Sequence, residues 1–267
     1  MESRDHLFTV WLTNNDWDAT PYLQEICVAS AQVMNRKPVT IYTNHELHLS
    51  FLDRKITHVE KIPEELMTMA ETITDNKAHQ SDYIRLSILA DKGGIYFDTD
   101  VLFYKPFTEL WDLMVQENYS LLYPREDANM ICNCMIMCCD TSKANKVLVD
   151  ILNNMEKRYI KHSYLFNSQK YIHLMSRRYP SELCIYSRPS LFEGKWNNPE
   201  SISNFIDGKN EGIGQHLYWS IKELWGTVRN NLDAHVYDVK PATFPTKLTK
   251  YIIDQYIDLM KEADNNE

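Results

Sequence analysis

The sequence predicts an α/β fold in which a largely parallel sheet is flanked by helices. Three observations lead to this prediction. The chain opens with a strand, a helix and a second strand. A long helix that ends in Gly93-Gly94 is followed by short β-prone runs, and helical and strand patterns keep alternating after it. Such alternation is typical of βαβ units and of a mostly parallel sheet.

The opening unit is predicted from three local patterns. The apolar run at residues 7–12 is typical of a buried strand. Residues 20–35 carry apolar side chains at helical spacing, and Asp18 or Thr20 is the candidate N-cap. Residues 38–42 form a short β-branched run and therefore a second strand.

The long helix is expected at residues 75–91 and ends at Gly93, because glycine tolerates the left-handed conformation of a helix cap. Beyond it the patterns predict strands at residues 95–97, 101–104, 119–123, 131–137 and 183–186, and helices at residues 142–159, 167–179, 215–228 and 248–261. The residues from 263 onward are expected to be frayed.

Composition narrows the class of protein. The 267 residues are 44% hydrophobic and 24% charged, which suits a chain that buries a sizeable core. The absence of any Pro-, Gly- or Ser-rich linker favours one continuous domain, with residues 1–230 as its body and residues 231–267 as a C-terminal helical extension that packs on it. A net charge of −9 argues against nucleic acid as a partner.

The sequence predicts no transmembrane segment, because no run of about 18 apolar residues occurs. The N-terminus is too acidic for a signal peptide, so we expect a cytoplasmic protein. Peripheral membrane contact is an alternative suggested by Lys247, Lys250 and Lys261, although a solvated helix face explains these lysines more simply.

Four of the six cysteines crowd into Cys132, Cys134, Cys138 and Cys139. One interpretation is a metal cluster. The other is a buried strand that uses cysteine as a small apolar residue. The second interpretation is favoured, because the Cys-x2-4-Cys pairs of structural zinc sites are missing and adjacent strand residues point to opposite faces.

The chemistry is expected at Asp98 and Asp100, which follow directly on a predicted strand. Open α/β sheets bind ligands at the carboxyl ends of their strands, and Mg²⁺ and Mn²⁺ prefer carboxylate oxygens. Asp82 and Arg85 share a face of the preceding helix at i, i+3, so this face can look toward the two carboxylates. The alternative for Asp82 and Arg85 is a surface ion pair worth about 0–1 kcal/mol.

The run Asp82-x-x-Arg85-x-x-x-Leu89-x-x-x-Gly93-Gly94-x-Tyr96-x-Asp98-x-Asp100 resembles the core motif of the DXD-containing, sugar-nucleotide-dependent glycosyltransferases. This family includes capsular and lipopolysaccharide sugar transferases, the yeast initiating mannosyltransferase and, more distantly, the clostridial glucosylating toxins. Weaker similarities lie in Val10-Trp11-Leu12, at Asn133, and in His216 with Ser220.

The resemblance implies a GT-A-type fold and a retaining transfer from a nucleotide-sugar donor, a UDP- or GDP-sugar, to a glycan or lipid-linked acceptor. It implies Mn²⁺ or Mg²⁺ as the cofactor. It further implies three sets of site residues, which overlap. The catalytic residues would be Asp98, Asp82 and Arg85; the metal ligands would be Asp98, Asp100 and His216; and the donor would contact Trp11, Leu12, Asp82, Arg85, Gly94, Tyr96, Asp98, Asn133 and Ser220.

Within these roles, Trp11 would stack on the nucleobase, and His216 would lie at the start of the helix predicted from residue 215 or just before it. A neutral His216 would be the better ligand, so activity is expected to fail as histidine protonates below about pH 6.5.

Three alternatives use the same residues differently. A haloacid-dehalogenase-like phosphatase also has a strand followed by Asp-x-Asp, but it normally opens with this motif and carries a second acidic pair. A glycoside hydrolase needs carboxylates roughly 5–9.5 Å apart across a sugar. A carbohydrate- or nucleotide-binding module without activity would not need Asp82, Arg85, Asp98 and Asp100 together.

Overall fold

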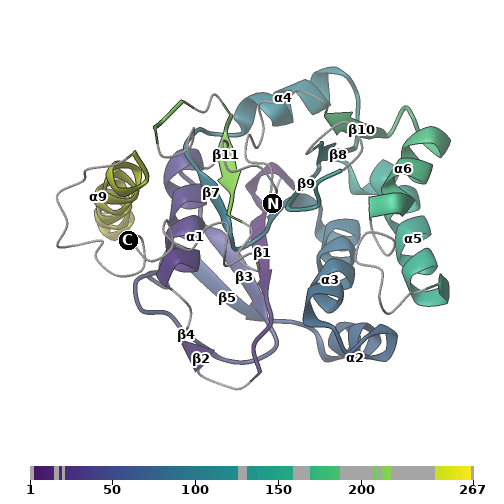
Figure 1. Ribbon diagram of the computed structural model, residues 1–267, viewed down its shortest axis with the longest axis horizontal. Helices are drawn as coiled ribbons and strands as arrows, with labels where there is room; N and C mark the ends of the chain where they lie inside the picture. The colour runs from purple at the N-terminus through teal and green to yellow at the C-terminus, as the bar shows by residue number, and fades with distance from the viewer. Residues whose placement is uncertain are drawn as a thin grey trace.

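The protein, seen in a computed structural model, is built around a seven-stranded sheet with helices on both faces (Figure 1). The structure describes residues 3–14, 18–19, 22–125, 131–158, 169–186, 207–209, 212–217 and 244–265. The sheet strands are β1 (Leu7–Trp11), β3 (Val39–Thr43), β5 (Thr57–Lys61), β6 (Gly94–Phe97), β8 (Leu121–Pro124), β9 (Met135–Cys138) and β10 (Leu183–Tyr186). Their order is β10-β8-β9-β6-β1-β3-β5.

All neighbours in this sheet are parallel except β9, which runs antiparallel to both β6 and β8. The mixed, mostly parallel sheet predicted from the sequence is therefore confirmed. Because β1, β3 and β6 are parallel, the residues that follow Trp11, Thr43 and Phe97 emerge at one edge. Asn44 joins two of these ends, since its side chain accepts a hydrogen bond from the Thr13 amide at 2.9 Å and donates one to the Thr13 carbonyl at 3.0 Å.

Alternate residues of each strand serve opposite faces. Ile95 and Phe97 of β6 belong to one apolar cluster, whereas Tyr96 belongs to the other. The first cluster includes buried residues of α1 (Tyr22–Asn35), α4 (Thr108–Gln116) and α9 (Phe244–Asn265). The second includes buried residues of α3 (Lys77–Lys92), α5 (Thr141–Arg158) and α6 (Gln169–Arg178), with Ala70 of α2 (Glu64–Ile73).

Short elements complete the structure at the edges of the sheet. A 3₁₀ turn, η1 (Ser3–Asp5), precedes β1, and the short parallel strands β2 (Asp18–Ala19) and β4 (Leu47–His48) pair with each other. β7 (Val101–Phe103) follows β6 almost at once and forms an antiparallel ribbon with β11 (Gly214–His216). Through this pairing, residues 214–216 lie close to the carboxyl end of β6, although they are far from it in the sequence.

The C-terminal helix α9 lies beside α1, as Figure 1 shows. Its residues Leu248, Ile252, Ile253 and Tyr256 are buried in the first apolar cluster. The Tyr256 hydroxyl accepts a hydrogen bond from the Asp53 amide at 2.7 Å. Helix α9 therefore packs against α1. The boundary expected after residue 230 falls outside the described residues and stays a prediction.

Several sequence expectations need correction. Residues 215–216 lie in strand β11 rather than at the start of a helix, because their backbone pairs with β7; the rest of that predicted helix falls outside the described residues. Asp18 lies in β2 instead of capping α1, and Thr20 is not described. Residues 263–265 continue α9 rather than fraying. The helices α2 and α4 and the strand β5 were not predicted.

The described residues contain no helix that is both long enough and apolar enough to cross a membrane.

Candidate active site

Asp98 follows β6 at the carboxyl edge of the sheet. Its backbone amide donates to the Cys134 carbonyl at 2.7 Å. This bond fixes the start of the turn against the residue that precedes β9. The Val101 amide donates back to the Asp98 carbonyl at 3.1 Å, so the Asp98–Asp100 segment is a tight turn between β6 and β7. Two carboxylates are thereby held at the edge where open α/β sheets bind ligands.

Arg85 links the helix α3 to this turn. Its Nη1 donates to Asp98 Oδ1 at 2.7 Å and to the Tyr96 hydroxyl at 2.9 Å, and its Nη2 forms an ion pair with Asp82 Oδ1. The guanidinium carbon also lies 4.8 Å from the centroid of the Tyr96 ring. The planar guanidinium of Arg85 therefore holds the carboxylates of Asp82 and Asp98 in fixed positions.

The Asp82–Arg85 pair is not the surface ion pair that the sequence left open. Asp82 is 2% exposed and Arg85 is 4% exposed. The Asn133 side chain adds a hydrogen bond, donating from Nδ2 to Asp82 Oδ1 at 3.2 Å. Since buried charges need partners on all sides, this network constrains each of its members.

Tyr96 supports Asp98 from within the same strand. Because strand residues alternate, Tyr96 faces α3, and its hydroxyl donates to Asp98 Oδ1. Burial raises the pKa of the Tyr96 hydroxyl well above its ordinary value, so it remains a donor at neutral pH. Burial also raises the pKa of Asp98, helped by the nearby Asp100 carboxylate and opposed by Arg85.

His216 reaches Asp100 from strand β11. The pairing of His216 with Val101 and the 2.8 Å hydrogen bond from the Leu217 amide to the Asp100 carbonyl set the two residues side by side. His216 Nε2 lies 3.3 Å from Asp100 Oδ1. Burial alone would lower the pKa of His216, but the Asp100 carboxylate outweighs it and raises this pKa well above the usual value. The neutral imidazole is therefore lost at a higher pH than the expected 6.5.

Asp98, Asp100 and His216 can together hold a metal ion. One potential ligand atom from each of them lies within 4.8 Å of the other two. Their side chains remain 25%, 16% and 13% exposed, so the group is open to a ligand. Two carboxylate oxygens and an imidazole nitrogen suit a divalent cation, and the donor set therefore fits the Mn²⁺ or Mg²⁺ that the resemblance implies.

The remaining predicted residues are not members of the Asp98, Asp100 and His216 group. Trp11, at the end of β1, is nine-tenths buried within the first apolar cluster, and Leu12 is half-buried against the second. Gly94 lies at the opposite end of β6 from Asp98, where a Cβ atom would come within 2.2 Å of the His6 carbonyl oxygen. The close approach that this glycine permits is thus to the chain's own backbone. Ser220 falls outside the described residues.

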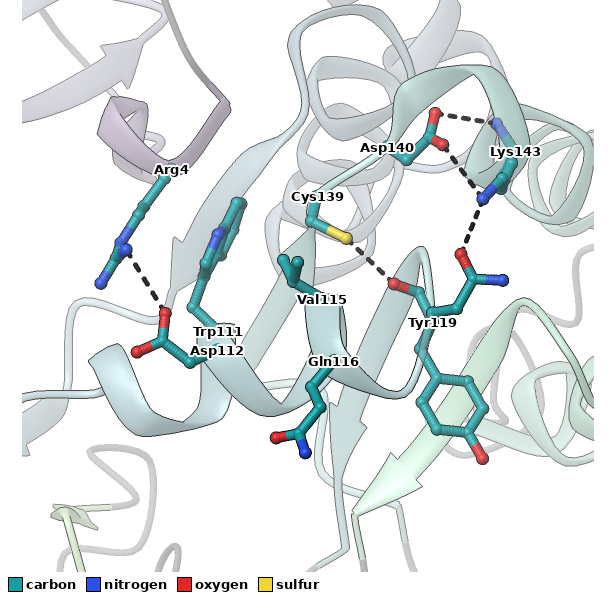
Figure 2. Close-up of a pocket in the computed structure, with 10 residues that line it drawn as sticks. Arg4, Trp111, Asp112, Val115, Gln116, Tyr119, Cys139, Asp140 and Lys143 are labelled. Atoms are coloured by element: carbon teal, nitrogen blue, oxygen red, sulfur yellow. Dashed lines mark hydrogen bonds and ion pairs between the residues drawn. The ribbon is translucent and has the colours of Figure 1, made fainter.

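A separate hollow of about 710 Å³ lies at the other edge of the sheet (Figure 2). Arg4, Trp111, Asp112, Tyr119, Cys139 and Lys143 are among its lining residues. Cys139 follows β9 beside the amino end of β6, so this hollow is remote from Asp98. None of the residues predicted for the site lines it.

Comparisons with known proteins relate part of the chain to a described family. Residues 10–120 match the family described as "Glycosyltransferase sugar-binding region containing DXD motif". This match agrees with the resemblance found in the sequence, and Asp98-Thr99-Asp100 is an Asp-x-Asp sequence within the matched residues.

One curated relative is "Subversion of eukaryotic traffic protein A" of Legionella pneumophila subsp. pneumophila (strain Philadelphia 1), which is 36% identical over 81 residues. The matched segment is 30% of this chain but only 12% of that protein. The chain thus corresponds to a small part of the relative's length.

Solved structures resemble the whole chain more loosely. The PaToxG glycosyltransferase is 14% identical, with a TM-score of 0.46, over 96% of this chain and 87% of its own. The galactosyltransferase LgtC, in complex with donor and acceptor sugar analogues, is 13% identical, with a TM-score of 0.49, over 88% of this chain and 98% of its own.

Proposed function

We propose that this chain is a divalent-cation-dependent, retaining glycosyltransferase. Its donor is a nucleoside diphosphate sugar, UDP- or GDP-linked, and its acceptor is a glycan or a lipid-linked sugar. The observation that carries the proposal is the gathering of Asp98, Asp100 and His216 within 4.8 Å of one another at the carboxyl edge of the sheet, directly beside the buried Asp82–Arg85 pair. The matched DXD region supports it.

Asp98, Asp100 and His216 are the residues that would hold Mn²⁺ or Mg²⁺. When bound there, the cation supplies positive charge that stabilises the nucleoside diphosphate as it leaves the sugar. The protein contributes a fixed set of ligands: Arg85 and Tyr96 orient Asp98, and the β7–β11 ribbon orients Asp100 and His216. Because these groups are placed in advance, little reorganisation is needed when the donor binds.

Asp82, Arg85 and Asn133 would hold the hydroxyl groups of the donor sugar. An ionised carboxylate offers about four acceptor positions. Arg85 and Asn133 both approach Oδ1 of Asp82, so Oδ2 offers further positions to sugar hydroxyls. Arg85 would also screen the negative charge of the diphosphate, since its own charge is retained at any working pH.

Trp11 and Leu12 would contact the nucleobase, since Trp11 ends β1 and Leu12 follows it at the same edge of the sheet as Asp98. The contact of Ser220 with the diphosphate stays a prediction, because Ser220 lies outside the described residues. The cytoplasmic location and the peripheral membrane contact also stay predictions.

Hydrolysis of a panel of nucleotide-sugars, measured with Mn²⁺, with Mg²⁺ and with a chelator, tests the proposed function. Slow hydrolysis of one donor, dependent on the cation, is the expected result. Asp112→Asn is a matched control, because Asp112 is an exposed acid paired with Arg4 outside the site. Release of phosphate from a simple phosphomonoester would instead indicate the phosphatase. Binding of a nucleotide-sugar without turnover, even with acceptors present, would indicate a binding module.

A further inference from the structure

Cys132 and Cys134 form a second group of metal-binding atoms next to the DXD turn. Both cysteines are buried, at 3% and 0% exposure, and their sulfur atoms lie 2.7 Å apart. Both side chains belong to the first apolar cluster, so they lie on the same side of the sheet. Neither cysteine belongs to a disulfide.

His216 completes this group from strand β11. One potential ligand atom from each of Cys132, Cys134 and His216 lies within 4.8 Å of the other two. A histidine from a distant strand thus supplies the third ligand that the local Cys-x-Cys spacing lacked.

The donor set has a different preference from that of the DXD turn. Two thiolates and one imidazole select a thiophilic cation such as Zn²⁺ and disfavour Mg²⁺ and Mn²⁺, which prefer oxygen. Three protein ligands with an open fourth position are a known zinc arrangement, and Cys₂His is one such set. A carboxylate against the ligating histidine, here Asp100 at 3.3 Å, is also typical of zinc sites.

His216 belongs to both groups, and this sharing has a chemical consequence. A neutral imidazole has one nitrogen with a free lone pair, because the other nitrogen carries the proton. It can therefore ligate one cation at a time. A second dication a few ångströms away would also repel the first.

We propose that Cys132, Cys134 and His216 form a binding site for a thiophilic divalent cation of the zinc class, and that its occupation prevents His216 from ligating a cation held by Asp98 and Asp100. Each thiol loses a proton to solvent as its sulfur coordinates, His216 loses one as well where its imidazole is protonated, and no group is oxidised or reduced. Zinc would then act as an inhibitor that competes with the Mn²⁺- or Mg²⁺-supported reaction. This inhibitory effect rests on the proposed function, whereas the binding site does not.

Cobalt(II) is the probe for the binding site, because thiolate–cobalt coordination gives a charge-transfer absorption that oxygen ligands do not give. The full chain is titrated with cobalt(II) in the presence of a non-thiol reductant. One equivalent should produce the absorption, and one equivalent of Zn²⁺ should abolish it. Cys132→Ser and Cys134→Ala should each lose it, whereas Cys184→Ser, a half-buried cysteine on β10 outside the group, should keep it.

The site is disproved if the reduced protein shows no such absorption, or if Cys132→Ser and Cys134→Ala keep it. Circular dichroism shows whether each variant is folded. If both variants unfold, binding by the unaltered chain is decided by His216→Ala, which leaves the thiols in place and should weaken cobalt binding by at least about 10-fold.

A second measurement tests the competition. Zn²⁺ should inhibit cation-dependent hydrolysis of the nucleotide-sugar by the unaltered chain, and the half-inhibiting concentration should rise at least about 10-fold in Cys132→Ser. Equal inhibition of both proteins would overturn the competition while leaving the site intact. Absence of hydrolysis under every condition would contradict the proposed function, and the cobalt spectrum would still decide the site.

Discussion

Asp100 Oδ1 lies 3.3 Å from Nε2 of His216, although the two residues are far apart in the chain. The backbone explains the contact: β11 pairs antiparallel with β7, and the Leu217 amide donates to the Asp100 carbonyl at 2.8 Å. Since β7 begins directly after Asp100, any residue that pairs there must come close to the DXD turn. The ribbon is therefore the structural reason why a late histidine reaches the two carboxylates.

The buried position of Arg85 makes Arg85→Lys an informative change. Lysine keeps the charge but lacks the planar fork that reaches Asp82, Asp98 and Tyr96 together. We expect kcat/KM for the nucleotide-sugar to fall by about 100-fold, because both carboxylates would be displaced. Removal of one partner of the buried pair, as in Arg85→Ala, should cost about 3–5 kcal/mol of unfolding free energy, because the Asp82 charge stays buried without it.

Arg36→Lys is the matched control for Arg85→Lys, because Arg36 forms an exposed ion pair with Glu262. It should change neither kcat/KM nor the unfolding temperature appreciably. Unaltered turnover and donor preference in Arg85→Lys would return the Asp82–Arg85 pair to a purely structural role.

Gly94→Ala should destabilise the protein without weakening donor binding. Gly94 has a φ of +107°, and an added Cβ would meet the His6 carbonyl oxygen at 2.2 Å. The backbone conformation alone should cost about 1–3 kcal/mol, and the clash adds to it. Gly208→Ala separates the two effects, because Gly208 also has a positive φ of 68° but lies in an exposed turn.

Thermal unfolding and nucleotide titration, both at a temperature where the variants are folded, check the expectation for Gly94. A Gly94→Ala protein with normal stability and reduced donor affinity would support the donor contact expected from the resemblance. It would contradict the packing role that the structure gives this glycine.

Trp11 can serve both the core and the nucleobase, and substitution separates the two roles. Trp11→Leu should lower the unfolding free energy by leaving a cavity. If the ring also stacks on the base, the affinity for the nucleoside diphosphate should fall by about 1–3 kcal/mol, and Trp11→Phe should restore most of it.

Trp111→Leu is the matched control for Trp11→Leu, since Trp111 is equally buried but lines the hollow at the other edge of the sheet. The Trp111→Leu substitution should lower the unfolding free energy and leave the affinity for the nucleoside diphosphate unchanged. Calorimetric titration with the nucleoside diphosphate and Mn²⁺ gives the answer. Equal affinities of Trp11→Leu and Trp111→Leu would remove Trp11 from the base site.

His6 makes the stability of the protein depend on pH. Burial lowers the pKa of His6, although its Nδ1 donates to the Gly93 carbonyl at 2.8 Å. The folded protein therefore keeps His6 neutral in a range where the unfolded chain, with a pKa of about 6.5, binds a proton. Because the unfolded state binds more protons there, stability falls as the pH decreases through about 6.5.

Urea unfolding at about pH 7.5 and about pH 5.5 measures this dependence. His6→Asn should reduce the difference between the two midpoints, whereas His58→Asn, at an exposed position of β5, should not. Buried His79 has a lowered pKa as well, so part of the dependence will remain. The same pH dependence in His6→Asn as in the unaltered chain would contradict the assignment.

Local pattern was sufficient to predict the elements that carry Asp82, Arg85, Asp98 and Asp100. The end of α3 at Gly93, whose φ is 66°, follows from a glycine that the chain places after a helical run. The position of the two aspartates after β6 follows from three β-prone residues before them. Hence the sequence predicted that these four side chains could meet.

The local sequence pattern did not predict elements that form by pairing with a strand far away in the chain. Residues 214–216 form a strand only because β7 is there to pair with, and nothing in their own sequence indicates it. The strand β5 and helix α2 have few buried residues, so their apolar periodicity is weak. The approach of Cys132 and Cys134 to His216 also depends on the tertiary fold, which the sequence analysis did not predict.

The measurement that tests the central claim most directly is cation-dependent hydrolysis of a nucleotide-sugar by Asp100→Asn. This substitution keeps the size of the side chain but removes the charge that would bind the cation. The side chain is 16% exposed and lies in a turn, so the fold should persist, as its unfolding temperature would show. Activity with Mn²⁺ should fall by at least about 100-fold, while Asp112→Asn keeps it. Undiminished activity of Asp100→Asn, or full activity of the unaltered chain in excess chelator, would contradict the account.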